Sequence, residues 1–128
     1  MRPDDAREKA WAVAAAADEV RAVDIVLLDI HLLTLIADFF VICTARSDTQ
    51  MQAIADRIQE RMEERGWRIL HQEGHRQSRW WLMDLGDVVV HIFQEEARAL
   101  YNLEQLWADA ARIEWSHLPA AMPQALTA

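Results

Sequence analysis

Three short runs of aliphatic residues constrain the fold of this chain more than any other feature. They lie at residues 24–29, 38–44 and 88–93, and the last is the most β-branched segment of the sequence. Aliphatic runs of this length, with charged residues at their boundaries, are typical of β-strands that are buried on both faces. We therefore expect a sheet that is covered by helices.

Two longer segments carry apolar side chains at spacings of three and four residues, which place these side chains on one face of a helix. Residues 4–20 form one such helix, and the second begins at Ser47 and ends before Gly66. Ser47 and Gln50 match a capping box, in which Gln50 reaches back to the Ser47 amide. We interpret both apolar stripes as core faces. The charged side of the second helix is predicted to be a solvated face; its residues are Arg57, Glu60, Arg61, Glu64 and Arg65.

The remaining segments complete a mixed sheet. Residues 67–73 and 80–84 are predicted strands, and Leu85-Gly86 is a tight turn that joins the second of them to the last aliphatic run in a hairpin. Residues 95–107 return to helical spacing, whereas residues 31–37 have no clear period and are predicted to be a loop. The order α-β-β-α-β-β-β-α predicts one α/β domain with a mixed five-stranded sheet flanked by helices.

Length and composition indicate one domain without a membrane anchor. The chain has 128 residues, and the composition changes after Arg112, so we expect a domain at residues 1–112 and a flexible tail at 113–128. No apolar run reaches the ~18 residues of a membrane span, and the N-terminus has neither the plan of a secretory signal nor that of a transit peptide. The chain is therefore predicted to be soluble and cytoplasmic. Cys43, the one cysteine, lies in an apolar stretch and is predicted to be a buried, inert thiol.

The net charge of the chain favours some classes of binding partner over others. The formal net charge is −8 and the isoelectric point is about 5.0, which disfavours direct binding to the phosphate backbone of a nucleic acid. The same negative field attracts a basic protein by steering the encounter.

Few residues form a pattern that favours catalysis. Asp84 and Asp87 could hold Mg²⁺ or serve as acid and base, but acids that bracket a hairpin turn are more often turn formers. A nucleotidyltransferase also needs a glycine in its phosphate loop, and the segment 44–47 has none. His71 and His75 lie in a predicted strand and loop and do not suit a metal. We expect no cofactor and no metal.

Tryptophan is the residue type that favours binding. Six tryptophans occur in the chain, and Trp80 and Trp81 are neighbours on a predicted strand, so their side chains point to opposite faces of the sheet. An exposed tryptophan near Tyr101 and several acids is typical of a protein-binding hot spot. A tryptophan-rich core is the alternative. His91 has two interpretations in the same way, either a core histidine or a polar group on a binding surface.

Several of these segments together resemble the ribosomal silencing factor family, also called the Iojap-like family, over about residues 8 to 110. The resemblance is carried by Asp38-Phe-Phe-Val-Ile-Cys-Thr44, by Ser47 at the start of a helix, by Glu73-Gly74, by Trp80-x-x-x-Asp84-x-Gly86-Asp87-Val-Val-Val-His91 and by Tyr101-x-Leu103-Glu104-x-Leu106-Trp107.

The resemblance implies a nucleotidyltransferase-like fold without that enzyme activity. It also implies binding to the large ribosomal subunit through its ribosomal protein number fourteen, which blocks subunit association and represses translation when nutrients are limited. A homodimer is implied for the free protein. The implied contact residues are Trp80, Asp84, Asp87, His91, Tyr101, Glu104 and Trp107.

Within this set we expect Trp80 and Tyr101 to be anchors, and we expect the carboxylates of Asp84, Asp87 and Glu104 to face basic groups of the partner. Trp107 has a second possible role, in locking the last helix onto the sheet. The family usually has glycine where this chain has Ala45, which puts the local geometry there in question. A small nucleotidyltransferase-like enzyme using Ser47, Asp84 and Asp87, and a homodimeric adaptor module, are the alternative functions.

Overall fold

The aliphatic runs form the centre of a six-stranded mixed sheet in the computed structural model, which describes residues 3–75 and 77–115. β1 (Val23–Asp29) pairs antiparallel with β2 (Phe39–Ala45), and β2 pairs parallel with β5 (Val88–Gln94). Every residue of β2 is buried, as expected for a strand with a layer on each side. The α/β class and the mixed sheet are therefore confirmed.

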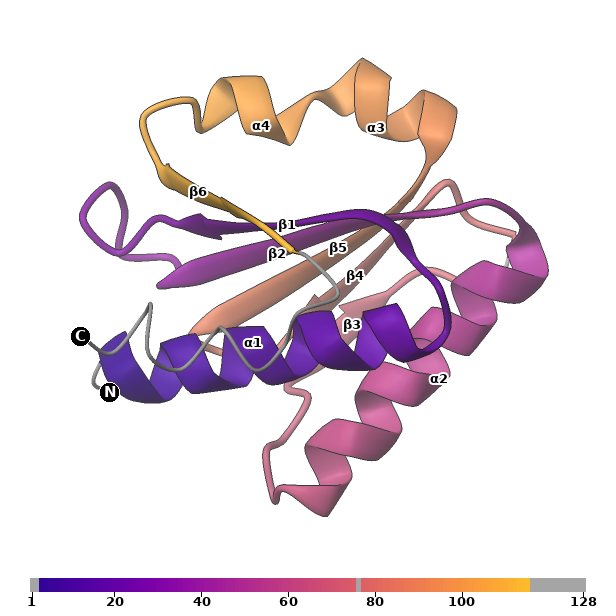
Figure 1. Ribbon diagram of the computed structural model, residues 1–128, viewed down its shortest axis with the longest axis horizontal. Coiled ribbons are helices and arrows are strands. Elements are labelled where there is room, and N and C mark those ends of the chain that lie inside the picture. Colours follow the sequence, from indigo (N-terminus) through magenta and orange to yellow (C-terminus); the bar gives the residue numbers. More distant parts are fainter. Residues whose placement is uncertain (1–2, 76, 116–128) are drawn as a thin grey trace.

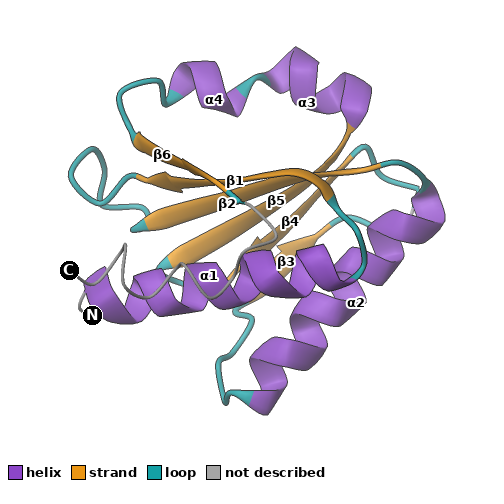
Figure 2. Cartoon of the chain, viewed as in Figure 1, coloured by secondary structure: helices purple, strands orange, loops and turns teal. Residues whose placement is uncertain are grey.

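Helices cover the two faces of this sheet (Figures 1 and 2). α1 (Pro3–Glu19) and α2 (Asp48–Glu64) lie on one face, and α3 (Glu95–Tyr101) and α4 (Leu103–Leu106) lie on the other. The strand order is β3-β4-β5-β2-β1-β6, in which β3 is His71–Glu73, β4 is Trp80–Asp84 and β6 is Ala111–Glu114.

The predicted helical stripes are core faces. Ala6, Ala10, Val13 and Ala17 of α1 are fully buried, and small side chains at these positions let the helix approach β1 and β2 closely. The apolar stripe of α2 packs into the same cluster. This contact, which is rich in alanine, holds α1 closely against the sheet.

Ser47 caps α2 as predicted, whereas Gln50 binds elsewhere. The Ser47 hydroxyl accepts the Gln50 amide at 3.1 Å. The Gln50 side chain accepts the Arg46 amide instead of the Ser47 amide, and its Nε2 donates to the Arg21 carbonyl at 2.8 Å. Gln50 therefore ties the start of α2 to the turn after α1.

The charged side of α2 is only partly a solvated face. Arg57 and Arg61 both bind the Glu19 carboxylate of α1, at 2.7 and 2.8 Å, and Arg65 binds Glu8 at 2.8 Å. These hydrogen bonds, that from Arg61 first, lower the pKa of Glu19. The prediction was wrong in this respect because the spacing within one helix does not reveal that a second helix lies alongside.

Two predicted elements have different bounds. The strand predicted at residues 67–73 begins only at His71, because β4 is short and offers no partners beyond the bond from the Leu70 amide to the Asp84 carbonyl. The helix predicted at residues 95–107 is broken at Asn102, which adopts a left-handed conformation with φ of 46° and starts α4.

The sixth strand lies at the end of the described chain. β6 pairs antiparallel with β1, and it includes Ile113 and Glu114. The sheet thus continues past residue 112, where we placed the end of the domain. Residues 116–128 of the predicted tail lie outside the described residues. Within residues 3–75 and 77–115, none of the helices has the length and apolar character needed to cross a bilayer.

Candidate protein-docking surface

The helices α3 and α4 cover only part of their face of the sheet. α3 packs on β5 and β2, and the side chains of β4 that share this face, Trp80, Leu82 and Asp84, remain half-buried. Tyr101, at the end of α3, is 51% exposed beside them. We call these four residues the open face.

Aromatic rings form the centre of the open face. The ring of Trp80 lies 4.7 Å from that of Tyr101 and 5.0 Å from that of Phe93, centroid to centroid. Trp80 therefore presents a rigid apolar edge, held by rings on both sides, next to the exposed ring of Tyr101. The structure brings these two predicted anchors together.

A hydrogen bond from Trp80 to the buried ring of His91 holds Trp80 in place. The His91 ring is buried, and the Trp80 indole Nε1–H donates to His91 Nδ1 at 3.1 Å. Burial lowers the pKa of His91 to about 4, so the ring is neutral at physiological pH. Because Nδ1 accepts, the proton of the neutral ring lies on Nε2. His91 is buried as a core histidine and orients Trp80, but it is not fully satisfied, because its Nε2 has no hydrogen-bond partner among the described residues.

Asp87 does not belong to this face. Its carboxylate is 4% exposed and binds the ammonium of Lys9 in α1 at 2.7 Å. Lys9 also donates to the Leu85 carbonyl at 3.3 Å. Asp87 therefore joins α1 to the β4–β5 turn and cannot face a partner, which corrects the role that we expected. The reason is that Asp87 lies in the turn just before β5, where its side chain reaches Lys9 of α1 on the opposite side of the sheet from Asp84.

Asp84 remains on the open face as a turn former. Its carboxylate accepts the Gly86 amide at 2.8 Å, and Gly86 has a positive φ of 94°, which glycine adopts without strain. Asp84 and Asp87 are held by separate partners and do not converge on one point. Among the described residues, no three acidic, histidine or cysteine side chains are grouped in a way that would hold a metal ion.

Glu104 is already paired within the chain. It binds Arg98 of α3 at 3.0 Å and Arg112 of β6 at 2.8 Å, and its side chain is 19% exposed. The hydrogen bond from Arg98 is the largest cause of a lowered pKa of Glu104. Its expected role in facing a basic partner does not fit these contacts.

Trp107 has the second of its two expected roles. Its ring meets the ring of Phe40 edge-on at a centroid distance of 5.5 Å, so it locks the segment after α4 onto the sheet. Trp81 points to the other face, is 7% exposed, and donates its indole N–H to Gln72 at 3.0 Å. Of the adjacent pair, only Trp80 reaches the open face.

Sequence reasoning missed the apolar side chains that are exposed near the open face and in the loop between β1 and β2. Leu82 was assigned only to a strand. The exposed aliphatic residues are Leu32, Leu33, Leu35 and Ile36 in the loop, and Leu100 and Leu106 in the helices. The sequence of the loop does indicate this exposure. Residues 31–37 are rich in aliphatic side chains, but these have neither the helical nor the strand spacing that would place them together on a buried face.

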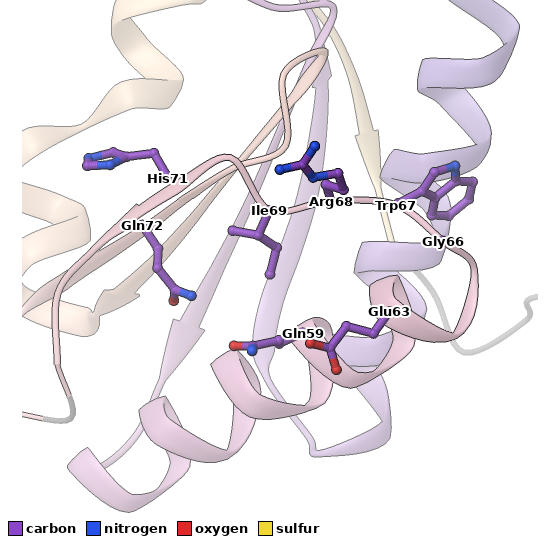
Figure 3. Close-up of a pocket in the computed structure, with 8 residues that line it drawn as sticks. All are labelled: Gln59, Glu63, Gly66, Trp67, Arg68, Ile69, His71 and Gln72. Atoms are coloured by element: carbon purple, nitrogen blue, oxygen red, sulfur yellow. The ribbon is translucent and has the colours of Figure 1, made fainter.

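A polar pocket of about 460 Å³ lies on the other side of the molecule, between α2 and the segment before β3 (Figure 3). Gln59 and Glu63 of α2 line one wall, and Ile69 and Gln72 line the other. His71, at its margin, has its Nε2 within hydrogen-bond distance, 2.8 Å, of the Glu73 carboxylate. None of the implied contact residues lines this pocket, so it is separate from the open face.

Cys43 and Ala45 have ordinary structural roles. Cys43 is fully buried, and burial raises the pKa of its thiol to about 12, so it is inert as predicted. Ala45 is the last residue of β2 and keeps a strand conformation. The absence of glycine at that position therefore causes no strain.

The chain matches a known family over nearly its whole length. The family model described as "Ribosomal silencing factor during starvation" matches residues 3–127. The ribosomal silencing factor RsfS of Bacillus subtilis is 50% identical over 97 residues, which are 76% of this chain and 82% of that protein. The chloroplastic protein Iojap of Zea mays is 40% identical over 87% of this chain and 49% of its own length.

Solved structures agree with this result. A crystal structure of a Chromobacterium violaceum protein superposes with a TM-score of 0.75 at 32% identity, covering 84% of this chain and 88% of that one. A crystal structure from Bacillus halodurans superposes with a TM-score of 0.71 at 42% identity, covering 81% and 94%. Both solved structures thus share the fold of this chain over more than four fifths of its length.

Proposed function

Because the chain belongs to the family of ribosomal silencing factors, we propose that it binds the large ribosomal subunit through ribosomal protein number fourteen and blocks subunit association by steric occlusion. It is a ribosome-associated regulator of translation and not an enzyme. Its action represses translation under nutrient limitation, in the cytoplasm.

The observation that carries this proposal is the open face. Trp80 and Tyr101 are aromatic anchors held in place by Phe93 and His91, and Leu82 lies between them and Asp84 on β4. Binding energy at protein interfaces is concentrated in such fixed aromatic residues with a polar rim. An interface of about 800 Å² per partner is roughly a tenth of the chain's 7395 Å² surface.

The charge of the chain supports a basic protein as the partner. The net charge is −8, and Asp84 on the open face and Glu73 on the neighbouring strand β3 place negative groups at its rim. Such a rim accelerates the encounter with a positively charged surface and makes the association rate fall with salt. The same charge argues against sequence-specific binding to ribosomal RNA.

Sedimentation with isolated subunits tests the proposal. The protein is expected to pellet with large subunits and to remain in the supernatant with small subunits. Trp80→Ala should weaken the binding by more than about thirtyfold, the loss typical of a hot-spot tryptophan of ~2 kcal/mol.

A matched pair of variants separates the open face from the rest of the surface. Leu82→Lys places a charge on the open face and should abolish binding, whereas Leu70→Lys, at a position 61% exposed before β3, should leave it intact. Equal pelleting of the Leu82 variant and the wild-type protein would exclude the open face as the binding site.

The free protein pairs with a second copy through the same apolar surface. The observation that favours this pairing is the number of large hydrophobic side chains exposed near the open face, Tyr101 and Leu100 among them. Size-exclusion chromatography over a dilution series should reveal a concentration-dependent homodimer, and Leu82→Lys should elute as a monomer throughout. An unchanged dimer in that variant would place the pairing elsewhere.

A further inference from the structure

Arg98 connects three parts of the chain that lie far apart in the sequence. From α3, its Nη1 donates to the Asp24 carbonyl at 2.6 Å and to the Thr44 hydroxyl at 2.8 Å. Its Nε donates to Glu104 at 3.0 Å. The Arg98 side chain is 12% exposed, and its bonds to Thr44 and Glu104 are partly buried, where hydrogen bonds are stronger than on an open surface.

Glu104 extends this connection to the edge of the sheet. One carboxylate oxygen binds Arg98 and the other binds Arg112 of β6 at 2.8 Å. Arg98, Glu104 and Arg112 therefore form one continuous chain of charges, which we call the clasp. It runs from α3 and α4, which lie over the sheet in Figure 1, to β6 at the edge of the sheet.

The clasp spans the break between the two helices. Tyr101 is the last residue of α3, and Asn102, with its left-handed backbone, starts α4. The Asn102 amide donates to the Arg98 carbonyl, so Arg98 lies one turn before the break and Glu104 lies just after it. Asn102 alone connects the two helices, which have seven and four residues, and helices this short depend on tertiary contacts for their stability. The Arg98–Glu104 ion pair spans this break, and Tyr101 lies between its two residues in the sequence.

We propose that the clasp positions Tyr101 against Trp80 and thereby gives the open face its shape, and that Glu104 is a positioning residue that does not touch the partner. This inference rests on the proposed function. It accounts for a carboxylate in the family motif whose two oxygens are both occupied inside the chain. With an arginine on each oxygen and a side chain only 19% exposed, Glu104 has its charge balanced inside the chain and offers little surface to a basic partner.

The tyrosine itself reports on the clasp, because the chain contains only one. Replacement of this residue by 3-fluorotyrosine gives a single fluorine resonance, whose position depends on the Trp80 ring 4.7 Å away. The variants are Glu104→Gln and Arg112→Gln, with Arg112→Lys as the conservative substitution that keeps the charge. Glu63→Gln, an exposed position on α2 on the other side of the sheet, is the matched control.

Glu104→Gln should move the fluorine resonance of the free protein and weaken sedimentation with large subunits by about tenfold. Arg112→Gln should have a smaller effect in the same direction, and Arg112→Lys should restore both readouts. Glu63→Gln should leave both unchanged. The Arg112 variants keep the Arg98–Glu104 pair, so they report even where Glu104→Gln folds poorly.

Two results would overturn the inference. Weaker binding with an unmoved fluorine resonance would mean that Glu104 contacts the partner directly. A moved resonance with intact binding would mean that the position of Tyr101 does not matter to the partner. If the wild-type protein does not pellet with large subunits, the proposed function fails, and the fluorine resonance of the free protein still decides whether the clasp holds Tyr101.

Discussion

Lys9→Met should destabilise the protein strongly although Lys9 lies far from the open face. The Lys9 ammonium and the Asp87 carboxylate are 2.7 Å apart, and their side chains are 8% and 4% exposed. Removal of the lysine leaves a buried carboxylate without its counter-charge, which costs about 3 to 5 kcal/mol. An unfolding entropy of about 2.1 cal/mol/K per residue corresponds to roughly 0.27 kcal/mol/K for 128 residues. The melting temperature should therefore fall by about 11 to 19 °C.

Thermal unfolding followed by circular dichroism measures this change, and a second variant isolates its cause. Lys9→Met/Asp87→Asn removes the stranded charge, so it should recover most of the lost stability. Both variants should still pellet with large subunits at a temperature where they are folded. A drop of less than about 3 °C for Lys9→Met, or a double variant no more stable than the single one, would refute the argument that Asp87 is a buried structural group.

Three further predictions concern His91, Cys43 and Gly74. The pKa of His91 is about 4 when the protein is folded and 6.5 when it is unfolded, so the unfolded state binds more protons between these pH values. The free energy of unfolding, measured by chemical denaturation, should therefore fall by about 3 kcal/mol from pH 6.5 to pH 4. His91→Gln should reduce this dependence on pH, and a variant with the same dependence as the wild-type protein would contradict the lowered pKa of His91. Cys43, with a pKa of about 12, should not react with iodoacetamide at pH 8 until the protein unfolds; rapid labelling of the native protein would contradict its burial. Gly74→Ala should lower the stability by about 1 to 3 kcal/mol, since φ is +126° and the new Cβ would lie 3.0 Å from the Trp81 Cα; an unchanged melting temperature would show that the backbone relaxes there.

Much of the fold could be predicted because its signals are local. The aliphatic run at 38–44 and the stripe of α1 each reveal the environment of their own side chains, and both lie where the sequence placed them. Ser47 caps its helix for the same reason, because the donor that it binds is three residues away. The spacing of apolar residues within a segment indicates whether a strand is buried on both faces and which face of a helix is buried.

The parts that were missed depend on distant partners. β6 is short, and most of its side chains are exposed. It forms a strand because it pairs with the edge of β1. The helical spacing of apolar residues continues through Asn102 and therefore predicts one unbroken helix. The left-handed conformation of Asn102 nevertheless ends α3 there. Neither feature has a signal within its own segment that outweighs the alternatives.

The candidate site was predicted in its centre and not at its edges. Trp80 and Tyr101 were chosen for their residue type, and they do lie together. Asp87 and Glu104 were chosen for their charge, but Lys9 binds Asp87 across 78 residues of sequence, and Arg98 and Arg112, on the elements before and after α4, bind Glu104. A carboxylate in a motif can be structural or functional, and only the position of the nearest cation distinguishes the two.

Site-specific photo-crosslinking from position 82 tests the central claim most directly. A benzophenone side chain in place of Leu82 lies on the open face, and the same group at Leu70 lies outside it. After irradiation with purified large subunits, mass spectrometry should identify ribosomal protein number fourteen as the main adduct from position 82 and no such adduct from position 70. Adducts from position 82 to other ribosomal proteins alone, or the same adduct from both positions, would contradict the account.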